Sequence, residues 1–225
     1  MIKTAHTEFG PIRCYDNDHI GQILLSGNYY EKELISYMVN NSDGSGIALD
    51  IGANIGTHTL AFAQSFFGVW SFEPQGHIYG LLKENTYKLT NVRTFNAAIG
   101  HMKGFCYLDN DIREEDAKVN YGGVGITVTG NTRVPMLTID DLNIHNITFI
   151  KIDVEGAENV VFYGAQRTIK EQKPVIFFES MAADKFLKRN RIYNEQISGF
   201  EPVKFLVNLG YKMERVKNNY LCIPK

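Results

Sequence analysis

Cysteine is scarce in this chain, and neither sign of charge is in excess. The three cysteines, Cys14, Cys106 and Cys222, are widely separated and lack the paired spacing of a zinc site or a redox dithiol. We expect them to be reduced thiols. The 23 Lys and Arg residues are balanced by 25 Asp and Glu residues, for a formal net charge of −2. Without a positive excess there is no global field to hold a phosphate backbone, so no nucleic-acid partner is predicted.

The sequence also lacks a long hydrophobic run. No uninterrupted apolar segment approaches the roughly 18 residues that span a bilayer. The opening MIKTAHTEFG has neither the basic flank nor the apolar stretch of a signal peptide. We therefore expect a soluble, intracellular protein of the cytoplasm, without a membrane span.

The chain does have the composition of a globular protein with a substantial core. Of its 225 residues, 44% are hydrophobic and 12% are aromatic, which suits one domain of ordinary size. From residue 46 onward, short apolar runs alternate with helical patterns. The runs with strand character are IALDI, VWSFE, NVRTFNAAIG, ITFIKIDV and PVIFFE. Such alternation predicts an α/β fold with a mostly parallel sheet and helices on both faces.

We predict a single domain over residues 1–225. Residues 1–45 are expected to form an N-terminal hairpin and helix cap, and residues 46–225 the core. The alternation breaks over about 100–143, which predicts an inserted β and loop segment. Near the end of the chain, ENVVFYGAQRTIKEQ predicts one helix, and the last stretch predicts a helix followed by a hairpin that turns at 217–219.

The segment LDIGANIGTHTL carries the strongest functional signal. An acidic residue, Asp50, closes an apolar strand, and Gly52 and Gly56 open the turn into a helix. Glycines at such a turn let the backbone pass close to a ligand. Glu73 follows at the end of the next strand, where a carboxylate can accept hydrogen bonds from ribose hydroxyls. Together these features predict a cofactor that contains a nucleoside.

The spacing of the glycines helps to identify the cofactor. A dinucleotide site uses G-x-G-x-x-G to seat a pyrophosphate on bare amides, whereas this turn reads Gly52-Ala53-Asn54-Ile55-Gly56 after Asp50. An acid at that position disfavours a diphosphate. It suits S-adenosylmethionine, which carries an ammonium group and a sulfonium centre and has no phosphate. Asp50 and Asp153 are the acids expected to hold that positive end.

The motifs also resemble a known family. In order along the chain, LDIGANIGTHTLAFA, FEP, NAAIG, LTIDDL, IKIDVEGAE and VIFFE are similar to the pattern of FkbM-type S-adenosylmethionine-dependent methyltransferases. The resemblance covers roughly residues 30–180. It implies a Rossmann-like class I methyltransferase fold, with a seven-stranded, mostly parallel sheet and a C-terminal antiparallel hairpin. It also implies methylation of oxygen atoms on sugars or small natural products.

By position, the resemblance implies a full set of cofactor contacts. Departures from the family pattern are His58, the run FEPQG and the stretch from 109 to 125. The resemblance places Asp50, Gly52, Asn54 and Gly56 around the methionine part of the cofactor, and Glu73 at the ribose. It places Pro74 and Gln75 at the edge of the adenosine, and Asn96, Ala97 and Ala98 beside the adenine. Asp153 would face the reacting end.

Methyl transfer to a hydroxyl needs alignment of donor and acceptor and a group that takes one proton. Asp153 is our first candidate for the proton acceptor, because it ends a strand at the edge where ligands of open α/β sheets bind. Glu179 and His58 are the other main candidates. Further acids and histidines with weaker grounds are Glu155, Glu158, His77, His101 and His145.

A bound Mg²⁺ is a second way to acidify a hydroxyl. Asp153, Asp140 and Glu179 are the expected oxygen ligands, and Asp141 is a further one. Nothing in their spacing requires a metal.

The sequence therefore predicts an O-methyltransferase that acts on a hydroxyl of a sugar or glycan. Methylation of oxygen or nitrogen on a small molecule other than a sugar is an alternative. A catalytically silent module that only binds the cofactor is another. The residues indicate no partner protein and no oligomeric state.

Overall fold

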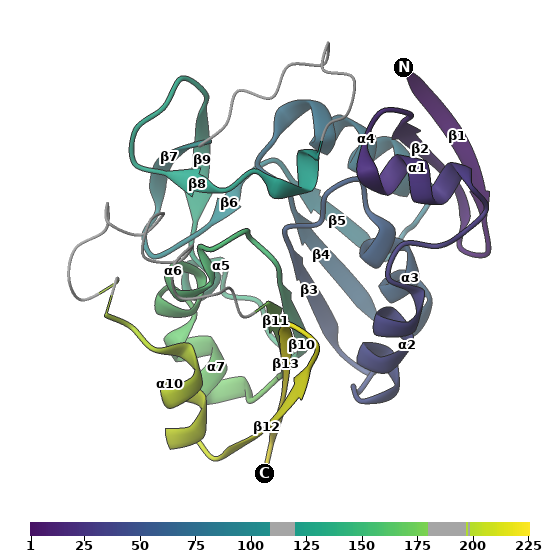
Figure 1. The fold of residues 1–225 in the computed structure, drawn as a ribbon. Coiled ribbons are helices and arrows are strands. Elements are labelled where there is room, and N and C mark those ends of the chain that lie inside the picture. Colours follow the sequence, from purple (N-terminus) through teal and green to yellow (C-terminus); the bar gives the residue numbers. More distant parts are fainter. Residues whose placement is uncertain (109–119, 180–196, 198) are drawn as a thin grey trace.

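The computed structural model describes residues 1–108, 120–179, 197 and 199–225. Its main sheet has seven strands in the order β12-β13-β11-β10-β3-β4-β5 (Figure 1). In chain order they are β3 (Ile47–Ile51), β4 (Gly68–Phe72), β5 (Val92–Phe95), β10 (Ile147–Ile152), β11 (Val175–Glu179), β12 (Tyr211–Val216) and β13 (Asn219–Pro224). Strands β5, β4, β3, β10 and β11 run parallel, and β13 pairs antiparallel with both β11 and β12. The predicted Rossmann-like fold with its C-terminal hairpin is confirmed.

Helices cover both faces of this sheet (Figure 1). Side chains alternate between the faces along each strand, so Ala48 and Phe149 join one buried cluster while Leu49 and Ile150 join another. The first cluster is closed by α2 (Lys32–Asn40) and α3 (Thr57–Ser65). The second is closed by α5 (Ile139–Leu142), α6 (Glu158–Tyr163), α7 (Gln166–Gln172) and α10 (Pro202–Asn208). The central strands are apolar on both sides for this reason.

The N-terminal residues form a small cap that packs on α4 (Gly76–Thr86) and the glycine turn. It consists of the hairpin β1 (Ile2–Thr7) and β2 (Gly10–Tyr15), the helix α1 (His19–Leu25) and the segment 26–31 that leads into α2. Its apolar side packs with α4 through Ile78 and Leu81. The carboxylate of Asp18 begins α1 by accepting the backbone N–H groups of Ile20 and Gly21. The cap therefore lies beside the glycine turn that leads into α3.

The segment inserted near 100–143 forms a second sheet. Its order is β6-β9-β7-β8, from β6 (Ala98–Ile99), β9 (Arg133–Leu137), β7 (Gly104–Leu108) and β8 (Ile126–Thr127). A short 3₁₀ helix, η1 (Tyr121–Gly123), precedes β8. The run NVRTFNAAIG was expected to be one strand, and that prediction is wrong: β5 belongs to the main sheet and β6 to the second. The chain turns between them at Asn96, whose side-chain amide donates to the carbonyls of Glu73 and Pro74.

The single helix predicted over ENVVFYGAQRTIKEQ is also interrupted. It divides into α6 and α7 at Gly164 and Ala165. A Cβ atom on Gly164 would lie 2.0 Å from the carbonyl oxygen of Gly100, so the backbone passes close to the second sheet at this point. This long-range contact explains why the helix is interrupted between α6 and α7, and a helical sequence pattern does not reveal it.

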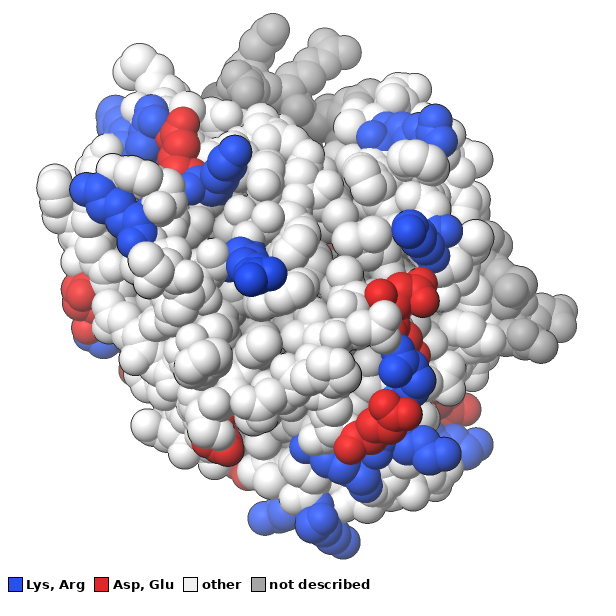
Figure 2. All heavy atoms as spheres, turned by 180° about the vertical axis from the view of Figure 1, so that it is seen from behind, with Lys and Arg blue, Asp and Glu red and all other residues white. Residues whose placement is uncertain are grey.

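None of the helices in the described ranges has the length and apolar character needed to cross a lipid bilayer. The face in Figure 2 carries Lys and Arg side chains in scattered positions, with Asp and Glu side chains among them. Charges of both signs are therefore mixed on the described part of this face.

Candidate functional site

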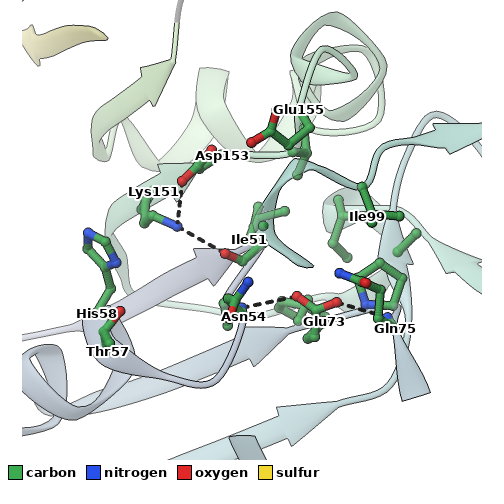
Figure 3. Close-up of a pocket in the computed structure, with 18 of the residues that line it drawn as sticks. Ile51, Asn54, Thr57, His58, Glu73, Gln75, Ile99, Lys151, Asp153 and Glu155 are labelled. Atoms are coloured by element: carbon green, nitrogen blue, oxygen red, sulfur yellow. Dashed lines mark hydrogen bonds and ion pairs between the residues drawn. The ribbon is translucent and has the colours of Figure 1, made fainter. Parts of the chain in front are cut away.

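A cavity of about 300 Å³ lies at the carboxyl ends of β3, β4 and β10 (Figure 3). The strand order reverses between β3 and β10, and ligands of open α/β sheets bind at such a switch point. One wall comes from the glycine turn and the start of α3. The remaining walls come from the ends of β4 and β10, from β6, from the N-terminal cap and from residues 120–126.

The glycine turn forms the floor of the cavity. Gly52 has a φ of +81°, and a Cβ atom there would lie 1.8 Å from the carbonyl oxygen of Asp153. Any larger residue would push apart the ends of β3 and β10. Asn54 lines the cavity, whereas Gly56 does not: it precedes α3 and packs against Leu82.

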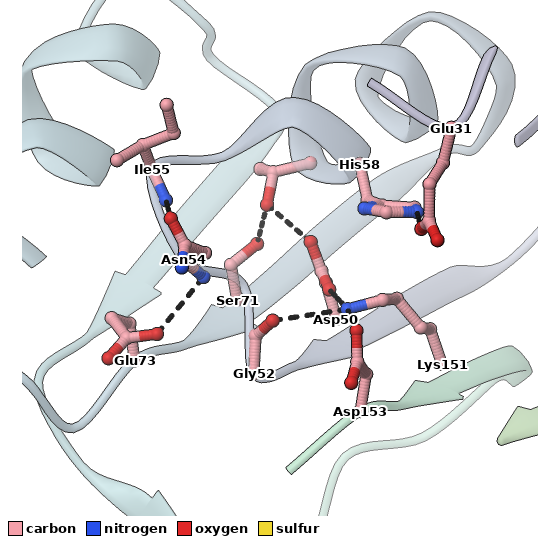
Figure 4. Close-up of polar contacts among 11 residues, drawn as sticks. Glu31, Asp50, Gly52, Asn54, Ile55, His58, Ser71, Glu73, Lys151 and Asp153 are labelled. Atoms are coloured by element: carbon pink, nitrogen blue, oxygen red, sulfur yellow. Dashed lines mark hydrogen bonds and ion pairs between the residues drawn. The ribbon is translucent and has the colours of Figure 1, made fainter. Parts of the chain in front are cut away.

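Glu73 is the best-defined acid of the site. It is 3% exposed, and its two carboxylate oxygens accept the backbone N–H groups of Asn54 at 3.0 Å and Gln75 at 2.8 Å. Burial raises the pKa of Glu73 to about 7, although these hydrogen bonds act in the opposite direction. The carboxylate is fixed at the edge of the cavity (Figure 4).

Flat, small and apolar surfaces lie beyond Glu73. This end of the cavity is lined by Pro74, Ala97, Ala98 and Ile99. The expected Asn96 does not line it, because its side chain makes hydrogen bonds within the turn between β5 and β6. The side chain of Gln75 donates to the carbonyl of Tyr121 at 2.8 Å. That bond ties residues 120–126, which form another wall of the cavity, to the start of α4.

Asp50 does not have the place we expected. It is fully buried and is not among the cavity's lining residues. One oxygen accepts the hydroxyl of Thr59 at 2.7 Å, and the other lies 3.3 Å from the ammonium nitrogen of Lys151. Asp50 and Lys151 are direct partners in the register of β3 and β10. The carboxylate of Asp50 is therefore paired with Lys151 inside the protein and does not face the cavity.

Lys151 is the functional residue that the sequence analysis missed. Its side chain is 3% exposed and lines the cavity, and its ammonium donates to the carbonyl of Gly52 at 3.1 Å and lies 3.5 Å from Asp153 (Figure 4). Burial lowers the pKa of Lys151, but Asp50 and Asp153 more than offset this effect and the pKa is raised. The available signal was a lysine inside the apolar strand ITFIKI, where a charge needs a partner.

The end of the cavity opposite the apolar surface is polar. Asp153 and Glu155 follow β10, and His58 and Tyr30 face them from the other side. His58 is buried in the first turn of α3, and Tyr30 lies edge-on to it with ring centroids 6.5 Å apart. Of the three main proton acceptors expected from sequence, Asp153 and His58 line the cavity, whereas Glu179 is not among the lining residues.

The expected metal ligands are not brought together as a set. Carboxylate oxygens of Asp153, Glu155 and Glu179 lie within 4.8 Å of one another. Asp140 instead caps α7, where its oxygens accept the backbone N–H groups of Arg167 and Thr168. The expectation of Asp140 as a ligand beside Asp153 and Glu179 is corrected, because a helix start uses its carboxylate.

Of the weaker candidates, Glu155 lines the polar end of the cavity and the other four do not line it. His77 contacts the ring of Tyr121, with centroids 4.9 Å apart. Glu158 is buried at the start of α6 and accepts the N–H of Gly156, and burial raises its pKa to about 8. The described residues that line the cavity include none of His77, His101, His145 and Glu158.

Comparisons with known proteins identify several methyltransferases as similar to this chain. A 24% identical relative, the hexuronic acid methyltransferase AglP of Haloferax volcanii, matches 151 residues, which are 65% of this chain and 61% of that protein. A solved methyltransferase FkbM from Methylobacillus flagellatus KT is 19% identical, with a TM-score of 0.49 over 79% of this chain and 44% of that one. A putative methyltransferase from Streptococcus mutans, solved with SAH, is 10% identical, with a TM-score of 0.49 over 85% of this chain and 97% of that one.

The chain thus spans 61% of the length of the first of these relatives and 44% of the second. A sequence model of the methyltransferase FkbM domain matches residues 50–213, well over half of the chain. That range holds the glycine turn, Glu73 and the IKIDVEGAE segment. The chain therefore belongs to the FkbM methyltransferase family.

Proposed function

We propose that this chain transfers a methyl group from S-adenosylmethionine to a hydroxyl of a sugar or glycan. The observation that carries the proposal is Glu73, a buried carboxylate fixed by two backbone amides next to a glycine turn. Such a carboxylate suits a ribose with two neighbouring hydroxyls. The sugar acceptor is supported by the hexuronic acid methyltransferase relative. Cytoplasmic location stays a prediction.

The cavity residues fit the parts of this cofactor. Glu73 would hold the ribose, and the apolar surface of Pro74, Ala97 and Ile99 would hold the adenine against residues 120–126. The methionine part would follow Gly52 and Asn54 toward the polar end. There, Asp153 and Glu155 are the acids that line the cavity, since Asp50 pairs with Lys151 in the protein interior.

The bound cofactor supplies an activated methyl carbon on a sulfonium. The protein's task is to align the acceptor hydroxyl with that carbon, exclude water and take one proton. Asp153, Glu155, Tyr30 and His58 surround the polar end, where the acceptor would lie.

We propose that the reaction runs without a metal. Asp153, Glu155 and Glu179 offer the oxygen ligands that Mg²⁺ prefers, but one oxygen of Asp153 already lies 3.5 Å from the ammonium of Lys151. A cation bound there would be repelled by that charge. Turnover should survive dialysis against EDTA. Loss of turnover that added Mg²⁺ restores would show that the acidic cluster binds a metal.

Calorimetric titration with SAM and SAH tests the cofactor assignment. Glu73→Gln should weaken binding about 10- to 100-fold, the worth of one or two hydrogen bonds to a charged group. Glu84→Gln is the matched control, because Glu84 is an exposed acid whose side chain contacts Arg13 away from the cavity. Equal affinity in the two variants would contradict the proposed ribose contact.

Mass spectrometry tests the acceptor. Purified protein with SAM should add one methyl group to a member of a panel of neutral and uronic-acid sugars. Transfer only to amines or to aromatic hydroxyls would refute the sugar assignment. Tight SAM binding without transfer to any of these acceptors would favour a silent binding module.

A further inference from the structure

Three consecutive residues of the N-terminal cap dock on the first turn of α3. The hydroxyl of Tyr29 donates to the carbonyl of Thr57 at 2.6 Å. The ring of Tyr30 lies edge-on to His58, and the carboxylate of Glu31 lies 3.3 Å from Nε2 of His58. The cap thus holds the same turn of α3 that lines the cavity.

His58 joins this contact to the cavity. Its side chain is 5% exposed, with Nε2 directed at Glu31 (Figure 4). The other ring nitrogen is turned toward the side of the cavity where Lys151 and Asp153 lie (Figure 3). A carboxylate beside one ring nitrogen favours the tautomer that carries the proton there, which leaves the second nitrogen as a proton acceptor.

Glu31 has a backbone conformation that serves this contact. It precedes α2 with φ 53° and ψ 30°, a left-handed conformation that a residue with a side chain seldom adopts. Its carboxylate makes no capping hydrogen bond to α2. Burial raises the pKa of Glu31, but the contact with His58 outweighs it, and the pKa lies below its ordinary value. Glu31 is therefore anionic beside the imidazole.

The neighbours of these two candidate bases differ in sign. Asp153 lies 3.5 Å from the ammonium of Lys151, so its carboxylate already contacts a cation. His58 lies 3.3 Å from the carboxylate of Glu31, which can stabilise an imidazolium formed by proton transfer. The two contacts favour His58 over Asp153 as the proton acceptor.

We propose that His58 is the general base of the methyl transfer and that Glu31 is its positioning residue. The inference rests on the proposed function. As the acceptor oxygen forms its bond to the methyl carbon, the bond from that carbon to sulfur breaks and its electron pair stays on the sulfur. The hydroxyl proton passes to the free ring nitrogen of His58. The resulting imidazolium is stabilised by Glu31.

Other groups around His58 also affect its protonation. His58 itself lies in the first turn of α3, at the positive end of that helix. The charged and titratable side chains that share this end of the site are Tyr30 and Glu31 before α2, His19 of α1, and Lys151, Asp153 and Glu155 of the β10 end. Glu31 is the one in contact with Nε2.

An NMR titration of the histidines tests the pair without any acceptor. His58→Gln assigns the resonance of His58. Glu31→Gln should lower its titration midpoint by about one pH unit, a tenfold change in proton affinity, because an adjacent carboxylate is lost. Glu33→Gln is the matched control, since Glu33 is exposed on the same helix. An unchanged midpoint in Glu31→Gln would overturn the proposal.

Steady-state kinetics with an acceptor that the protein methylates test the role of His58 as general base. His58→Gln should lower kcat by 100-fold or more, and Glu31→Gln by roughly 10-fold, in line with usual general-base contributions. SAH affinity should stay within about twofold, because neither change touches Glu73. In Glu31→Gln the acid limb of the pH profile should move to lower pH, which a structural role would not cause. The double variant should be no slower than His58→Gln.

The two proposals fail separately. Loss of SAM binding in the unaltered protein would refute the proposed function, whatever the NMR midpoints show. Normal methyl transfer by His58→Gln would refute the base while leaving the methyltransferase assignment intact. In that case the same kinetics on Asp153→Asn would test Asp153 as the proton acceptor.

Discussion

We expect the protonation state of Glu73 to control the affinity of the cavity for the cofactor. Its pKa is raised to about 7 by burial, so its charge changes close to neutral pH. In the proposed complex the ionised form would accept hydrogen bonds from ribose hydroxyls, and the protonated form would be a poorer acceptor. We expect SAH affinity to fall by up to about tenfold per pH unit below 7. Calorimetry between pH 5.5 and 8.5 checks this, and Glu73→Gln should show a flat profile.

The unliganded protein should respond to pH in the opposite direction. The pKa of Glu73 is higher in the folded state, at about 7, than its ordinary value of 4.5. Its contribution to stability is therefore fully present below about 4.5 and lost as pH rises through 7. Thermal melts with and without SAH separate the two effects. Parallel pH profiles with and without ligand would contradict a role for Glu73 in binding.

Lys151 should be essential to stability. Replacing it with Met leaves Asp50 buried without a cation, and breaking a buried pair in this way costs about 3–5 kcal/mol. Lys170→Met, an exposed change on α7, should have little effect. Urea unfolding measures the difference.

A second change should relieve this cost. Asp50→Asn in the Lys151→Met background removes the uncompensated charge, so the double variant should be more stable than Lys151→Met alone. Additive losses in the double variant would mean that Lys151 acts mainly through packing.

At the scale of elements, the N-terminal cap and residues 120–126 depend on one carboxylate. Asp18 is 3% exposed, and it accepts two N–H groups at the start of α1 and the backbone N–H of Tyr121. Asp18→Ala should lower the free energy of unfolding by about 1–3 kcal/mol. It should also weaken SAH binding, because residues 120–126 form a wall of the cavity. Asp16→Asn, at an exposed ion pair, should melt close to the unaltered protein.

Hydrogen exchange shows where the effect of Asp18→Ala arises. Faster exchange is expected at the amides of α1 and of residues 121–123, with β3 and β10 unchanged. Uniform acceleration across the main sheet would mean that the change acts on global stability and not on the cap.

Helices and strands were predicted well where a periodic pattern of apolar residues defines them, and poorly where a long-range contact sets their ends. The strands of the main sheet follow from apolar runs, because they are buried on both faces. The break between α6 and α7 comes from the approach of Gly164 to Gly100. The division of β5 from β6 comes with hydrogen bonds from Asn96 to Glu73 and Pro74. Neither contact has a local signature.

For the whole molecule, cofactor binding should appear as added stability. A ligand at 100 times its Kd stabilises the folded state by about 2.7 kcal/mol. At 2–4 °C per kcal/mol for a chain of this size, SAH should raise Tm by roughly 5–10 °C. A nicotinamide dinucleotide should leave Tm unchanged, because the turn after Asp50 lacks the dinucleotide glycine spacing. A comparable shift with the dinucleotide would contradict the cofactor assignment.

Fold class, family and the residues of the glycine turn follow from the sequence alone, because periodic burial and short motifs are local properties. The pairing of charged side chains at the site follows only from the folded arrangement of the chain. The register of β10 and β3 pairs Lys151 with Asp50, so an acid expected at the cofactor is used inside the core. The docking of the cap brings Glu31 to His58 across 27 residues of chain. The Lys151–Asp50 and Glu31–His58 pairs both depend on how distant segments pack together, and local residue spacing does not predict that packing.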